Sequence, residues 1–259
     1  MAPINCRTCH QIHTTYTGDD YARTTSAPVV LVSGGETLDL GDGDANMCAT
    51  CHQARNIEDR SDIPVVLDGA DVTLTSTRYG FHHGPIAQTI GNTGAYAFDG
   101  SATIPTTNFH VQDCTLCHMA EAEGGVESGG HTWRMAFGAE GDVEQNTNGC
   151  NVEACHGVGG IESFDQSGTQ TAVQDLLVQI ETILVEQGIK AALSPAPYDE
   201  ETLEEYAVLG TYPANLVAAF ANWQLFAEDW SYGAHNSRYA RRVLTNTLEY
   251  LQTLAPPAG

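Results

Sequence analysis

Basic residues are scarce in this chain of 259 residues. Ten Lys and Arg stand against 33 Asp and Glu, giving a formal net charge of −23, and Lys190 is the only lysine. Proteins that bind nucleic acid or an anionic membrane carry a concentrated positive surface, so we expect neither partner. Long apolar runs are missing too: no stretch of about 18 apolar residues occurs, so no membrane insertion is expected.

Cysteine and histidine, by contrast, are plentiful and regularly placed. The eight cysteines all fall within residues 1–155 and form four pairs, and the second cysteine of each pair is followed directly by a histidine. Three pairs have the spacing C-x-x-C-H, and the fourth has four residues between its cysteines. The four motifs comprise Cys6, Cys9 and His10; Cys48, Cys51 and His52; Cys114, Cys117 and His118; and Cys150, Cys155 and His156.

The C-x-x-C-H pattern is the attachment signature of c-type haem. The two thiols add across the haem vinyl groups, and the adjacent histidine binds the iron. A disulfide framework, zinc sites or a single redox-active C-x-x-C would not explain a histidine after every second cysteine. The sequence therefore predicts four covalently attached haem c groups and neither a disulfide nor a free thiol.

These motifs also bear on localisation. Haem is joined to them outside the cytoplasmic membrane, so we expect an exported protein that is extracellular or on the cell surface, with the periplasm as the alternative. Cys6 lies where a signal peptide would stand, so the chain has the character of a processed form.

Each of the four irons needs a second axial ligand, and six histidines remain beside the four proximal ones. Methionines are few, and Met47 and Met119 flank haem motifs, so bis-histidine ligation with low reduction potentials is expected. His13 lies three residues after His10 and therefore starts on the proximal side of that haem, so it would serve another haem. The candidate distal ligands are His13, His83, His110, His131 and His235, with His83 preferred to its neighbour His82.

Composition divides the chain into two regions. Residues 1–165 hold every cysteine and only short apolar runs, at 29–32 and 65–67, which predict short strands or hairpins. Too little chain surrounds each haem there for a conventional core, so the macrocycles are expected to form it. Residues 166–259 show helical periodicity at 172–193, 214–227 and 235–254, and are predicted to form a C-terminal helical region that packs on the haem region. The expected fold class is a multihaem cytochrome c, with low regular secondary structure around stacked haems, short β-hairpins and C-terminal α-helices.

Several segments together resemble a known family. They are C-R-T-C-H-Q-I-H, C-A-T-C-H-Q, F-H-H-G-P, C-T-L-C-H-M-A with the later G-G-H-T-W, and S-Y-G-A-H-N-S-R-Y-A. They are similar to exported multihaem c-type cytochromes, and with four haems to the tetrahaem members that polymerise into extracellular cytochrome filaments (nanowires). The resemblance implies a homopolymer that carries electrons to external acceptors, with His13 ligating a haem of the adjacent subunit.

Two other functions stay open from the sequence. One is a non-polymeric periplasmic or cell-surface electron carrier that docks on redox partners. The other is a multihaem enzyme of the nitrite or hydroxylamine type, which needs a haem with an open axial position. The surplus of histidines argues against such a position, so the chain is not expected to be an enzyme.

Overall fold

The computed structural model describes residues 4–41, 44–54, 67–82, 84–108, 113–122, 127–139, 142–195, 198, 203 and 206–254. The chain divides into two compact units. Unit 1 comprises Met1–Val30, Thr37–Cys51 and Val111–Gln166, and unit 2 comprises Leu31–Glu36, His52–His110 and Ser167–Gly259. Within the described residues, no helix combines the length and apolar character that crossing a bilayer requires. All eight cysteines belong to unit 1.

Unit 1 is built from short elements. Its helices are α1 (Cys6–Cys9), α2 (Ala45–Ala49) and α4 (Cys114–His118), with 3₁₀ turns at Gly18–Tyr21 and Gly130–Thr132. Two antiparallel pairs join β1 (Val29–Val30) to β2 (Thr37–Leu38) and β4 (Ala136–Ala139) to β5 (Asp142–Gln145). Low regular secondary structure with short two-stranded sheets is therefore confirmed. The strand predicted at 29–32 is present but covers only two residues, and residues 65 and 66 lie outside the described part.

Side chains just before the first and third cysteine motifs start their helices. The Asn5 side chain accepts a hydrogen bond from the Arg7 amide, and the Asn5 amide donates to the Thr8 hydroxyl, so both ends of a capping box are present at α1. Asp113 plays the corresponding part at α4, accepting from the Thr115 amide at 3.1 Å. The residue just before each of these two motifs thus caps the short helix that the motif forms.

The described residues of unit 1 bury few apolar side chains. Neither α1 nor α4 buries a residue. The main cluster of buried apolar side chains lies entirely in unit 2. The buried apolar residues described in unit 1 are Val29, Leu40, Ala45, Ala49 and Ile161. A unit with so little buried apolar surface needs another source of cohesion.

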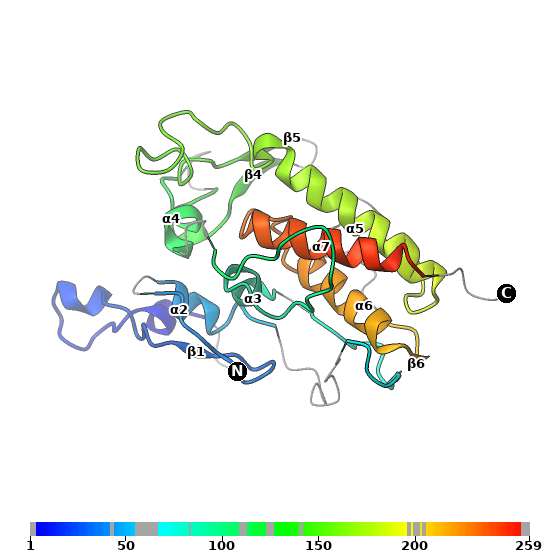
Figure 1. The fold of residues 1–259 in the computed structure, drawn as a ribbon. Coiled ribbons are helices and arrows are strands. Elements are labelled where there is room, and N and C mark those ends of the chain that lie inside the picture. The colour runs from blue at the N-terminus through cyan, green and yellow to red at the C-terminus, as the bar shows by residue number, and fades with distance from the viewer. Residues whose placement is uncertain are drawn as a thin grey trace. The chain divides into compact units, whose positions relative to one another are not determined.

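Unit 2 contains three longer helices that lie side by side (Figure 1): α5 (Thr169–Glu186), α6 (Ala214–Ala227) and α7 (Ser237–Leu251). The helix α3 (Ile86–Ile90) and an antiparallel pair of β3 (Val72–Leu74) with β6 (Gly210–Tyr212) complete it. The predicted C-terminal helices are confirmed. The first ends earlier than its periodicity suggests, because Gly188 has φ +75° and the backbone turns away there.

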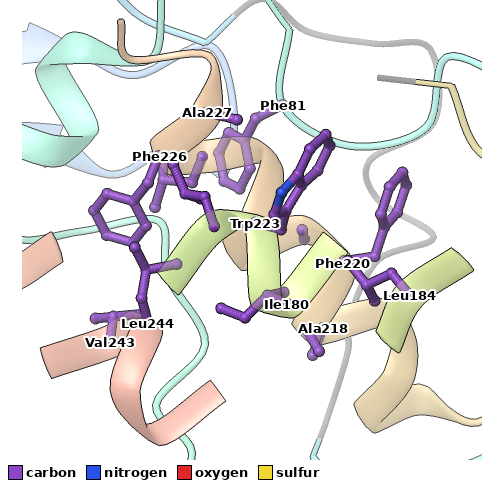
Figure 2. Packing of buried hydrophobic residues seen from close by; sticks show 14 of the residues in the cluster. Phe81, Ile180, Leu184, Ala218, Phe220, Trp223, Phe226, Ala227, Val243 and Leu244 are labelled. Atoms are coloured by element: carbon purple, nitrogen blue, oxygen red, sulfur yellow. The ribbon is translucent and has the colours of Figure 1, made fainter. Parts of the chain in front are cut away.

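Helix α6 forms the centre of the unit 2 core. Figure 2 shows Phe220 and Trp223 of α6 beside Ile180 and Leu184 of α5, and the two α6 rings stack with centroids 6.1 Å apart. The sequence predicted one apolar stripe on this helix, but nearly the whole surface of α6 is buried. Its polar side chains are accommodated by hydrogen bonds; Asn222, for example, pairs with the backbone of Tyr96 through both its amide oxygen and its amide nitrogen.

Candidate haem-binding site

Two of the four proximal histidines are held by backbone carbonyl groups. The Nδ1 atom of His10 lies 2.7 Å from the Tyr21 carbonyl oxygen, and that of His118 lies 3.0 Å from the Trp133 carbonyl oxygen. A neutral imidazole that donates from Nδ1 carries its lone pair on Nε2, which is the usual pattern for a metal-binding histidine. Because a carbonyl oxygen only accepts hydrogen bonds, both rings carry a proton on Nδ1, and in the neutral form the lone pair is on Nε2.

The other two proximal histidines are held through their backbone. The His52 carbonyl oxygen accepts a hydrogen bond of 2.9 Å from the Ala87 amide, and the His156 amide donates to the Cys150 carbonyl oxygen at 3.2 Å. Burial, together with the charge of His235, lowers the pKa of His52 and so favours its neutral, metal-binding form.

The cysteines of successive motifs are neighbours within unit 1. The thiols of Cys48 and Cys114 are neighbours: interaction with Cys114 lowers the pKa of Cys48, and interaction with Cys48, together with burial, raises that of Cys114. Cys117 and Cys150 form a second such pair, in which the pKa of Cys150 falls to about 7.

The Cys9 thiol of the first motif lies near the thiols of the second motif. Burial, followed by the charges of Cys48 and Cys51, raises the pKa of Cys9. Thiols of successive cysteine pairs are therefore neighbours in unit 1, in the order in which the pairs occur along the chain. None of the eight cysteines, all of which are described, forms a disulfide.

His131 is placed by a tight turn. The Gly130 amide donates to the Ala120 carbonyl oxygen at 3.0 Å. Gly129 has φ +71°, and a Cβ there would lie 2.5 Å from the same oxygen, so the turn requires glycine. The His131 ring centroid lies 6.3 Å from that of His10. Two imidazoles that bind one metal ion from opposite sides, with metal–nitrogen bonds of about 2 Å, have centroids about 6 Å apart.

His13 is exposed and lies on a loop that the Asp20 carboxylate closes. The amides of His13 and Tyr16 donate to Asp20 Oδ2 at 2.9 and 3.1 Å, and the amides of Thr14 and Thr15 donate to Oδ1 at 3.2 and 2.6 Å. These hydrogen bonds, led by that from the Thr15 amide, hold the pKa of Asp20 at about 2. The loop fixes the backbone of His13 at φ +64° while its side chain stays at the surface.

The other histidines considered as distal ligands are His235, His82, His83 and His110. In unit 2, the His235 Nδ1 atom lies 2.8 Å from Asp229 Oδ1. Burial tends to lower the pKa of His235, but the charge of Asp229 outweighs it and the pKa is raised. His82, which the sequence analysis ranked below His83 as a distal ligand, is buried. His83 and His110 lie outside the described residues.

Sequence reasoning missed the groups that orient the histidines: the carbonyls of Tyr21 and Trp133, and the Asp229 carboxylate. A backbone carbonyl leaves no sequence signal, whereas Asp229, six residues before His235, was visible but not singled out. Within the described part, no group of three or more His, Cys, Asp or Glu side chains is placed to hold a metal ion. The donor set, two thiols and one imidazole per motif, fits haem c. Comparison with family models, curated proteins and solved structures found no match.

Proposed function

We propose that this protein is an electron carrier that holds four covalently attached haem c groups. The observation that carries the proposal is the arrangement of the four cysteine pairs in unit 1, whose thiols are neighbours in chain order and each of which is followed directly by a histidine. Haems tethered in this arrangement follow one another closely, which is what electron transfer from haem to haem requires. The sparse apolar core of unit 1 agrees with this, because four macrocycles supply the apolar surface that the side chains lack.

In this proposal, His131 is the distal ligand of the first haem, opposite His10. The 6.3 Å separation of their ring centroids matches that of an axial pair, and the carbonyl of Tyr21 directs His10 Nε2 as the ligating atom. When bound, haem supplies a one-electron couple between its ferric and ferrous states. His10 and His131 would hold the iron of this haem with two imidazoles, a ligand set that would suit electron transfer and leave no position for a substrate.

The proposal extends to a homopolymer in which His13 ligates a haem of the adjacent subunit. Its side chain is exposed, and the Asp20-closed loop presents it on a fixed backbone. Subunits of charge −23 repel one another, but at physiological ionic strength that repulsion is screened beyond about 8 Å. An iron–imidazole bond between adjacent subunits offsets the repulsion that remains at shorter distances. The same role implies an exported protein that passes electrons to redox partners or external acceptors.

The decisive experiment combines haem analysis with electron microscopy of the purified protein. Mass spectrometry is expected to find four haems, and the ferric protein is expected to give only low-spin signals in electron paramagnetic resonance (EPR). Filaments are expected from the unmodified chain and from the matched control Thr14→Ala, whereas His13→Ala keeps four haems but does not polymerise. A chain with disulfides and no haem overturns the whole proposal. Discrete particles of the unmodified protein would instead favour the non-polymeric carrier.

A further inference from the structure

Asp229 is a buried carboxylate directly after α6, and it is surrounded by donors. Its Oδ1 atom lies 2.8 Å from His235 Nδ1 and 2.8 Å from the Thr89 hydroxyl, and its Oδ2 atom accepts a hydrogen bond from the Ser231 hydroxyl. Only 1% of its side chain is exposed. Burying a carboxylate is unfavourable unless its oxygens are hydrogen-bonded, so this arrangement persists only because each partner is in place.

The backbone around His235 is fixed as firmly as its ring. The His235 amide donates to the Ser231 hydroxyl at 3.2 Å, and its carbonyl oxygen accepts from the Asn108 side chain at 3.2 Å. The next residue, Asn236, caps α7 and also donates to the Thr89 carbonyl oxygen at 3.1 Å. A surface histidine with no task needs no such support. The His235 side chain keeps 23% of its surface exposed.

Helix α3 connects this cluster to His52 within unit 2. The Ala87 amide donates to the His52 carbonyl oxygen at 2.9 Å, and Thr89, two residues further along the same helix, contacts Asp229. The Ala54 amide completes the connection by donating to Gln88 Oε1 at 3.1 Å. His52 and His235 therefore share one scaffold, and they are close enough to interact electrostatically.

We propose that His235 is the distal ligand of the haem whose proximal ligand is His52, and that Asp229 is the positioning residue that fixes its ring. This inference rests on the proposed function. A carboxylate at Nδ1–H makes Nε2 a stronger electron donor than a carbonyl does, and this stabilises the ferric state. His10 and His118 have carbonyls at the same atom. Asp229 thus lowers the reduction potential of the His52 haem relative to haems oriented by carbonyls.

Spectroelectrochemical titration of the full-length haem protein tests the role of Asp229. In Asp229→Asn, which keeps the shape and one acceptor oxygen, one of the four midpoint potentials is expected to move positive while the other three stay in place. The matched control is Glu228→Gln, which replaces a buried carboxyl group one residue away. Equal shifts of the midpoint potential in both variants would show that Asp229 acts only through its charge, and would overturn its positioning role.

A second pair of variants tests ligation itself. His235→Ala is expected to convert one of four ferric haems from low-spin to high-spin in EPR spectra, and His235→Met is expected to restore the low-spin state at a higher potential. Four low-spin haems with unchanged potentials in both variants would overturn the inference and leave the proposed function intact. A wild-type protein without haem would remove the proposed function itself, so the two failures are distinguishable.

Discussion

Lys190, the only lysine of the chain, is buried rather than exposed. Its Nζ atom lies 2.9 Å from Glu181 Oε1, and the two side chains are 0% and 1% exposed. Glu181 also accepts hydrogen bonds from the Ser194 amide at 2.9 Å, the Ser194 hydroxyl at 2.7 Å and the Tyr198 hydroxyl at 2.8 Å. The ammonium lies 5.1 Å from the centre of the Trp223 ring. The pair thus joins α5 to the segment that follows it, inside unit 2.

Replacing Lys190 by methionine keeps most of the side-chain volume and removes the charge. The Glu181 carboxylate then remains buried with neutral donors only. Breaking a buried ion pair in this way costs about 3–5 kcal/mol of unfolding free energy. In a chain of this size that loss corresponds to a fall in melting temperature of about 6–20 °C. Because a buried pair also carries a desolvation penalty, the double variant Lys190→Met with Glu181→Leu is expected to recover most of the stability.

Thermal unfolding followed by far-ultraviolet circular dichroism measures these differences, because α5, α6 and α7 supply most of the helical signal. The control is Arg241→Met, an exposed cation on α7, which is expected to stay within about 0.5 kcal/mol of the unmodified protein. A loss below about 1 kcal/mol for Lys190→Met, against the expected range, would refute the reasoning. So would a double variant less stable than the single one.

Four further outcomes are expected. His131→Ala gives one high-spin ferric haem in EPR spectra, and an unchanged spectrum would remove His131 from the first haem. Asp20→Asn is expected to loosen the loop that carries His13, which would give faster hydrogen exchange in that segment and fewer filaments. Unchanged exchange would contradict the role of Asp20 in closing the loop. Leu177→Ala lowers unfolding free energy by about 2–5 kcal/mol in denaturant titration, because this α5 side chain is fully buried, and a smaller loss would mean that the core collapses around the gap. With all eight cysteines replaced by alanine, the haem-free protein is expected to lose hydrogen-exchange protection in unit 1 but keep it in α5; equal protection in both units would contradict a haem-dependent core.

Much of the architecture followed from local patterns. The periodicity of residues 214–227 predicted a helix with the bounds that α6 has, since Pro213 fixes its start. The pattern overran α5 because periodicity ignores Gly188, whose left-handed backbone ends the helix. The periodicity predicted a single apolar stripe on α6, whereas nearly all of its residues are buried. Which faces of a helix are covered depends on neighbours from distant segments, and here α5 and α7 lie against it (Figure 2).

The candidate site shows a similar division. The four motifs and their donor atoms are local, so the sequence alone predicts four haem tethers and four proximal histidines; that assignment stays a prediction. The sequence offered six candidates for the distal positions and no means of pairing them. His131 lies 121 residues from His10 along the chain, yet the centroids of their rings are 6.3 Å apart.

The available chemistry follows from residue types and short spacings alone: thiols, imidazoles, an excess of carboxylates and no long apolar run. These properties do not depend on folding. Which groups contact one another depends on the folded chain: the order of the thiols in unit 1, the carbonyls at Nδ1 of His10 and His118, and Asp229 at Nδ1 of His235. Such contacts join residues distant in sequence or use backbone atoms that every residue shares, so no local pattern encodes them.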